Sequence, residues 1–137
     1  MAAKENAGKR ALVTGASGGI GLELARILAA DGFDLVLLAR NATKLQEVAN
    51  ELKTNHGSNV TIVPADLADA NTPQAVFDTL AGAGLQVDLL VNNAGVLHEG
   101  RFSEVDLDVS LQLLQVNIVA MTAMTRLFLK PMLERNK

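Results

Sequence analysis

The sequence contains no cysteine, no tryptophan and no tyrosine among its 137 residues. The absence of cysteine excludes a disulfide framework and thiolate metal ligands, and we expect no metal site. The absence of tyrosine excludes a phenol as the proton donor in any reaction that this chain performs by itself.

Long runs of basic or apolar residues are also missing. No basic run is long enough to follow a phosphate backbone, and the net charge is −3, so we expect no nucleic-acid partner. Met1–Arg10 lacks the apolar stretch of a signal peptide, and no uninterrupted apolar run reaches the roughly 18 residues of a membrane span. We therefore expect a soluble cytoplasmic protein without a membrane partner.

The composition is that of a globular protein, and the length fits one domain, residues 1–137. Short apolar runs alternate with segments of helical periodicity, which predicts parallel β-α-β units with right-handed crossovers and hence an α/β fold. The runs expected as strands are Ala11–Val13, Leu35–Leu38, Val60–Val63 and Val87–Val91.

The last helix is expected near residues 107–134 and carries two apolar faces. We expect one of them to pack on the sheet; it holds Leu107, Leu111, Leu114 and Ile118. The other face holds Leu113, Val116, Ala120, Ala123 and Leu127. A helix with one side in water does not need this second face, which is covered by more chain, by another subunit or by the domain's own core.

A glycine-rich turn, Thr14–Gly21, joins the first strand to the first helix. Backbone N–H groups at such a turn, together with the helix dipole, favour an anion, and Ser17 adds a hydroxyl donor for a phosphate. The turn lacks the Gly-Lys-Ser/Thr ending of nucleotide triphosphate-hydrolysing loops. The strand before it and the amphipathic helix after it indicate a dinucleotide site, the alternative being a purely structural tight turn.

The second strand ends at Ala39-Arg40, with no carboxylate at its tip. An Asp or Glu at this point would hold the ribose hydroxyls of NAD, whereas the planar fork of an arginine suits a 2′-phosphate. The sequence therefore predicts NADP(H) rather than NAD(H), unless Arg40 is only a solvated surface residue.

Four motifs in this order resemble the classical short-chain dehydrogenase/reductase family: Thr14–Gly21, Asp66-Leu67, Asn92–Gly95 and Asn117. The resemblance implies a Rossmann-like doubly wound parallel sheet, truncated to about four strands in the order 3-2-1-4, with flanking helices. It implies that Asn117 matches the family's catalytic asparagine. The cofactor-binding residues that it implies are Gly15, Ser17, Gly18, Gly19, Ile20, Gly21, Arg40, Asp66, Leu67, Asn93, Ala94 and Gly95.

Several of these residues also have simpler interpretations. Asp66 could only form a turn or cap a helix, and the two asparagines before Ala94 could tie neighbouring loops together. Asn117 could bond backbone or water for structural reasons alone. His98 could face a substrate or be solvated.

The chain departs from the family in one respect. Members continue into a strand with a catalytic Ser and a helix with Tyr-x-x-x-Lys, and neither has a counterpart here. We therefore expect the N-terminal, cofactor-binding half of an NADP(H)-dependent oxidoreductase, inactive alone, whose substrate the sequence does not identify. The alternatives are a non-catalytic NADP(H)-binding module and a homo-oligomeric interaction module that pairs through the last helix or the exposed sheet edge.

Overall fold

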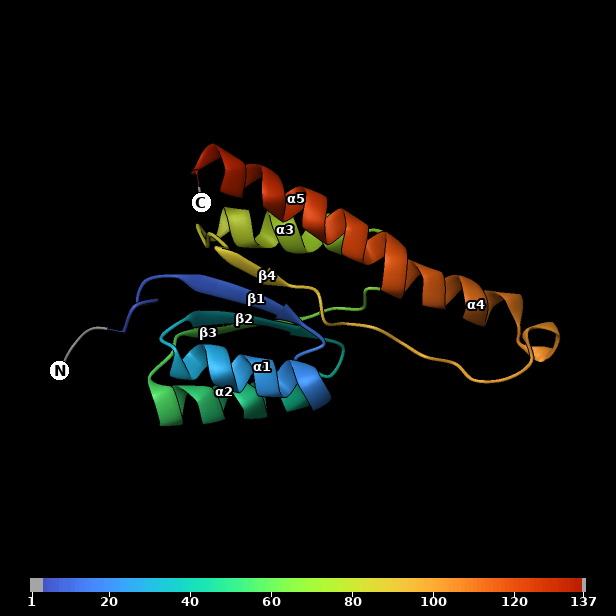
Figure 1. The fold of residues 1–137 in the computed structure, drawn as a ribbon, viewed down its shortest axis with the longest axis horizontal. Coiled ribbons are helices and arrows are strands. Elements are labelled where there is room, and N and C mark those ends of the chain that lie inside the picture. Colours follow the sequence, from blue (N-terminus) through green and yellow to red (C-terminus); the bar gives the residue numbers. More distant parts are fainter. Residues whose placement is uncertain (1–3, 137) are drawn as a thin grey trace.

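The computed structural model describes residues 4–136, which form three layers around one parallel sheet (Figure 1). The strand order is β3-β2-β1-β4, as predicted. Helices α1 and α2 cover one face of the sheet, and α3 and the long C-terminal helix cover the other (Figure 1). The elements are β1 Arg10–Thr14, α1 Gly19–Ala30, β2 Asp34–Ala39, α2 Ala42–His56, β3 Val60–Pro64, α3 Thr72–Gly82, β4 Leu89–Val91, the 3₁₀ turn Phe102–Glu104, α4 Leu107–Leu114, the π-helical segment Gln115–Ala120 and α5 Met121–Glu134.

The two central strands are buried on both faces. In β1, Ala11 and Val13 pack toward α1 and α2, while Leu12 packs into the cluster beneath α3 and α5. In β2, Leu35 and Leu37 lie on the first side, and Val36 and Leu38 lie on the second. This two-sided burial explains why both strands are continuous apolar runs without polar alternation.

The fourth strand is shorter than predicted, because it begins at Leu89 rather than at Val87. Just before this strand, Asp88 pairs with the backbone of Arg10 at the start of β1. Its N–H donates to the carbonyl of Arg10 at 2.8 Å, and its Oδ2 accepts from the Arg10 N–H at 2.9 Å. A carboxylate therefore satisfies the backbone donor that a strand carbonyl would otherwise pair.

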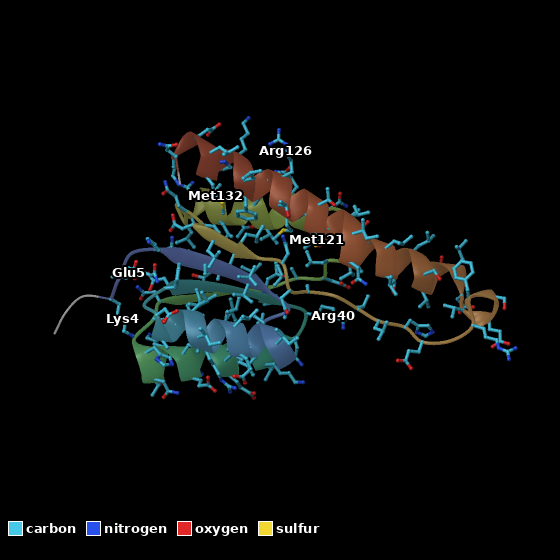
Figure 2. The ribbon with its side chains drawn as sticks, in the orientation of Figure 1. Lys4, Glu5, Arg40, Met121, Arg126 and Met132 are labelled. Carbon is cyan, nitrogen blue, oxygen red and sulfur yellow. The ribbon has the colours of Figure 1, made fainter. Side chains whose placement is uncertain are left out.

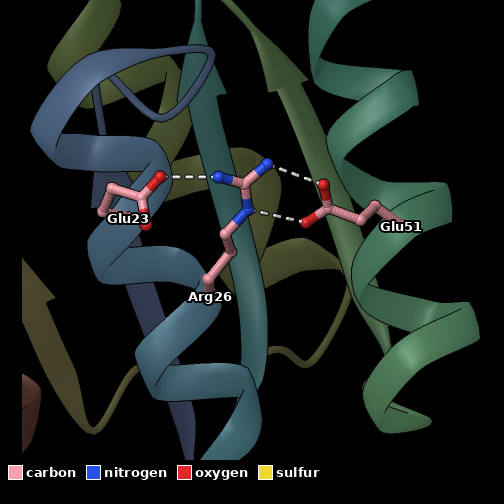
Figure 3. A network of polar contacts seen from close by, with 3 residues as sticks. All are labelled: Glu23, Arg26 and Glu51. Carbon is pink, nitrogen blue, oxygen red and sulfur yellow. Dashed lines mark hydrogen bonds and ion pairs between the residues drawn. The ribbon is translucent and has the colours of Figure 1, made fainter.

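A network of charged side chains joins α1 to α2, the two helices that cover one face of the sheet (Figure 3). Arg26 donates from Nε and Nη2 to the two carboxylate oxygens of Glu51, at 2.9 and 2.7 Å, and from Nη1 to Glu23 at 2.6 Å. The hydrogen bonds from Arg26 lower the pKa of the Glu51 carboxyl, and the same bonds raise the pKa of Arg26.

The prediction for the two faces of the last helix is wrong in orientation. The face expected to pack on the sheet is exposed: the solvent-exposed fractions are 69% for Leu107, 51% for Leu111, 44% for Leu114 and 52% for Ile118. The second face lies against the sheet and α3, where Val116 and Ala120 are buried, so the domain's own core is the one of the three possible covers that the structure shows. Both faces are apolar in sequence, so only the tertiary contacts decide which one is buried.

Leu107–Glu134 is also long and apolar enough to cross a membrane, judged by length and composition alone. The same test is passed by core helices of other proteins, so it is weak evidence for a membrane span. The expectation of no membrane partner accordingly receives no support from this helix and stays a prediction.

Candidate functional site

A cavity of about 590 Å³ lies at the carboxyl ends of the strands. The segments that follow β1, β2, β3 and β4 all contribute to its wall, and the far side is formed by α4 and Val116. The chain changes direction in the sheet here, because β2 and β4 lie on opposite sides of β1. Ligands of open α/β sheets bind at such a switch point. The cavity brings together seven of the predicted site residues: Gly15, Ser17, Arg40, Asp66, Leu67, Ala94 and Gly95.

Glycine is required at different positions of the turn after β1 for different structural reasons. Gly15 and Gly19 have positive φ angles of 64° and 56°, which other residues rarely adopt. A Cβ on Gly21 would collide with the carbonyl oxygen of Gly15, so the turn can pack against α1 only with glycine there. A Cβ on Gly18 or Gly19 would meet nothing within 4 Å. The start of α1 is therefore open to the space in front of it.

Thr14 joins the two glycine-containing motifs, a role that the sequence did not indicate. Its side chain is 1% exposed, and its Oγ1 accepts from the N–H groups of Asn93 at 3.0 Å and Ala94 at 2.8 Å. Asn93 returns the contact by donating from Nδ2 to the carbonyls of Thr14 and Gly15. The loop after β4 is thus fixed against the turn after β1.

The next residues of that loop are fixed by the C-terminal helix. Asn92 donates to Thr125 Oγ1 at 2.9 Å, which connects the end of β4 to α5. Asn117 accepts from the Val96 N–H at 2.8 Å and donates to the Val96 carbonyl at 2.7 Å. The interpretation of Asn93 as a tie between loops is confirmed, whereas Asn92 ties its loop to a helix. The simpler interpretation of Asn117, a hydrogen bond to backbone, is confirmed as well.

Asn117 lies within the π-helical segment Gln115–Ala120. Wider turns of this kind are rare in helices and occur frequently at functional sites. One regular helix was expected over this segment. The segment places Asn117 opposite Val96 while Val116 faces the cavity.

Arg40 follows β2 directly and lies at the carboxyl edge of the sheet (Figure 2). Its neighbour Asn41 caps α2 by accepting from the Lys44 N–H at 3.1 Å. Asn41 and Lys44 line the cavity beside Arg40, although neither was among the predicted site residues. The signal that could have found Lys44 is its position in the first turn of the helix that follows the second strand.

Asp66 and Leu67 form the cavity wall after β3. Asp66 Oδ1 accepts from the Ala68 N–H at 2.9 Å, and its carbonyl accepts from Thr72 Oγ1 at 2.6 Å. The turn-forming interpretation of Asp66 is therefore confirmed, and its side chain is still exposed at the cavity.

The remaining predicted residues lie outside the cavity wall: Gly18, Gly19, Ile20, Gly21, Asn93 and Asn117. Gly21 and Asn93 instead brace the residues that form it, and Ile20 is 73% exposed at the start of α1. His98 lines the cavity and is exposed. Within residues 4–136, no group of three His, Cys, Asp or Glu side chains is placed to hold a metal ion.

The residues present fit a phosphorylated dinucleotide. Arg40 and Asp66 line the cavity at the switch point of the sheet, and the open start of α1 follows closely after the wall residue Ser17. A helix start binds phosphate through free N–H groups, and the cation adds charge for a second phosphate.

Comparisons with known proteins identify the family and agree with the fold. The family model for short chain dehydrogenase matches residues 9–137. Nodulation protein G of Rhizobium sp. (strain N33) is 41% identical over 135 residues, which are 96% of this chain and 52% of the relative. L-Sorbose reductase from Gluconobacter frateurii, solved with NADPH and L-sorbose, has a TM-score of 0.89 and 30% identity, over 98% of this chain and 51% of its own. A short-chain dehydrogenase from Sphingobium yanoikuyae in complex with NADPH has a TM-score of 0.86 and 31% identity, over 93% of this chain and 49% of its own. The chain thus spans about half the length of these relatives.

Proposed function

The chain belongs to the short chain dehydrogenase family, and we propose that residues 1–137 are a single domain that binds NADP(H) as the cofactor-holding part of an oxidoreductase. The observation that carries the proposal is the cavity at the switch point, lined by the loops after all four strands. Two structural neighbours solved with NADPH support it.

Each part of the site has a separate task in this proposal. The start of α1 at Gly18 and Gly19, which follows the wall residue Ser17, receives the pyrophosphate, because it is open in front, the first N–H groups of a helix have no partner within the helix, and the helix dipole favours negative charge. Asp66 and Leu67 hold the adenine end, and Ala94 and Gly95 leave room for the rest of the cofactor against the backbone. The bound nicotinamide supplies hydride transfer to or from a carbonyl or alcohol carbon.

The preference for NADP(H) over NAD(H) rests on Arg40. Its guanidinium is exposed at the cavity, and within the described residues no carboxylate pairs with it. A guanidinium binds the oxygens of a phosphate in a bidentate manner. NAD(H) lacks the 2′-phosphate, so it offers the free guanidinium of Arg40 no such group at the adenosine ribose.

Replacing Arg40 tests this preference. We expect Arg40→Ala to weaken NADPH binding about tenfold, the loss of one charge-assisted contact, and to change NADH binding less than about twofold. Arg126→Ala is the matched control, because Arg126 points away from the sheet on α5 (Figure 2). Equal losses for both cofactors would argue against a 2′-phosphate contact at Arg40.

We also propose that the 137-residue chain does not catalyse the reaction by itself. It contains no tyrosine to act as the general acid. Carbonyl reduction by the purified chain, measured as NADPH oxidation with a panel of ketones, would disprove this.

A second candidate function is homo-oligomerisation through the exposed apolar face of the C-terminal helix. This face continues along the helix through Val119, Met121, Leu129 and Leu133, each at least 43% exposed. Contiguous apolar surface of this kind is typical of an interaction site. We expect a dimer by analytical ultracentrifugation, and a monomer after Leu111→Glu and Ile118→Glu; a monomeric parent chain would contradict the proposal.

A further inference from the structure

Two cations lie at one corner of the cavity without a protein partner. Arg40 directly follows β2, Lys44 lies in the first turn of α2, and both line the wall. Within residues 4–136, neither side chain forms an ion pair or a hydrogen bond. Unpaired cations that converge on one hollow, in a chain of net charge −3, indicate a site for an anionic group.

The position of Lys44 is fixed by its backbone. The Asn41 side chain accepts from the Lys44 N–H at 3.1 Å, and the next residue, Leu45, is fully buried against the sheet. The side chain of Lys44 is exposed beside the cavity, so the ammonium group can reach a ligand without disturbing the core. The first turn of α2 contains no acidic residue to neutralise it.

The other charged groups at the cavity lie on different elements. Asp66, after β3, is the acidic member of the wall, and one of its oxygens already accepts from the Ala68 N–H. His98 comes from the loop after β4. The charge of the wall is therefore divided, with two fixed cations at the β2–α2 corner and the carboxylate on the loop that follows β3.

We propose that Lys44 is a second specificity-determining residue, whose ammonium group binds a phosphate monoester together with the guanidinium of Arg40. This rests on the proposed function, in which that phosphate is the 2′-phosphate of NADP(H). The two side chains complement each other, because arginine offers a planar fork to two oxygens and lysine adds a compact charge with rotatable donors.

The test compares 2′,5′-ADP with 5′-AMP, two probes that share the adenosine and the 5′-phosphate and differ in the 2′-phosphate. Titration calorimetry is done on the 137-residue chain and on Lys44→Gln. We expect Lys44→Gln to weaken 2′,5′-ADP binding about fivefold, as for an exposed charge pair, and to leave 5′-AMP binding within about twofold. We also expect the affinity of Lys44→Gln for 2′,5′-ADP to fall less steeply with salt concentration than that of the parent chain, because one screened charge is removed.

Lys53→Gln is the matched control, because Lys53 is exposed in the last turn of the same helix, away from the cavity. If the parent chain prefers 2′,5′-ADP and Lys44→Gln keeps that preference as fully as Lys53→Gln does, the role of Lys44 is refuted and the proposed function stands. If the parent chain binds both probes equally or neither, the proposed function itself fails.

Discussion

At the residue scale, the site depends on small contacts that hold two loops at fixed positions. Thr14 and Asn93 exchange hydrogen bonds across the ends of β1 and β4, and Gly21 lets the turn approach α1. The glycine pattern predicted this turn. The bonding of Thr14 was not predictable, because one buried threonine hydroxyl in a strand leaves no pattern in the sequence.

Gly21 offers a direct test of the close approach. A methyl group there would overlap the Gly15 carbonyl, so we expect Gly21→Ala to lower the free energy of unfolding by about 1–3 kcal/mol, the cost of overpacking. Urea denaturation followed by circular dichroism measures it. Gly82→Ala is the control, because Gly82 is also helical and has nothing within 4 Å of its Cβ position. We expect that change to stabilise the chain by up to about 1 kcal/mol, and equal behaviour of both variants would refute the steric explanation.

At the element scale, the strands were predicted from the sequence more accurately than the last helix was. The apolar runs predict β1 to β3, since strands buried on both faces need no polar alternation. The last helix has two apolar faces, and the π-helical segment shifts the angular positions of its side chains near Asn117. Its orientation depends on contacts with α3 and with Val96, which are distant in sequence.

The corrected orientation of the last helix predicts that substitutions on its two faces lower the stability of the chain by different amounts. Met124 is fully buried and Leu111 is 51% exposed. We expect Met124→Ala to lower the free energy of unfolding by about 2–5 kcal/mol and Leu111→Ala by less than about 1 kcal/mol. Denaturant midpoints of the two variants, measured at one low protein concentration, decide between the faces. The reverse order would restore the orientation expected from the sequence.

The ion pairs between α1 and α2 predict a dependence of stability on pH. Arg26 lowers the folded-state pKa of Glu51, so this contribution is fully present above the ordinary pKa of glutamate, about 4.3. It is lost as the pH falls through the lowered pKa of the folded state. We expect Glu51→Gln to have a lower denaturant midpoint than the parent chain at pH 7, and the difference to shrink below about pH 4.

Glu47→Gln is the control for that pH series. Glu47 is exposed on the same helix and forms no ion pair in the part of the chain that the structure describes. A midpoint difference for Glu51→Gln that does not change with pH would show that the Arg26 contact acts through packing rather than charge.

At the scale of the whole molecule, the order of the strands brings distant motifs to one edge. The sequence predicted the order 3-2-1-4 through a family resemblance, and the turn after β1 meets the loop after β4 as that order requires. The shape of the cavity and the place of Lys44 in it were not predictable, because they depend on where four separate loops end. The relatives named above are about twice as long as this chain, and in the function that we propose the chain supplies the cofactor cavity of an oxidoreductase.

One measurement tests the central proposal most directly: the amide chemical shifts of the ¹⁵N-labelled chain, followed during titration with NADPH and separately with NADH. We expect saturable changes with NADPH at Gly15–Gly21, Arg40–Lys44, Asp66–Ala68 and Ala94–His98. The groove between α3 and α5, near Phe77 and Arg135, serves as the internal control and is expected to stay unchanged. With NADH we expect changes at the other three segments only, and at higher cofactor concentration, while Arg40–Lys44 stays unchanged. Changes centred on the α3–α5 groove, or none with either cofactor, would contradict a dinucleotide site at the carboxyl edge of this sheet.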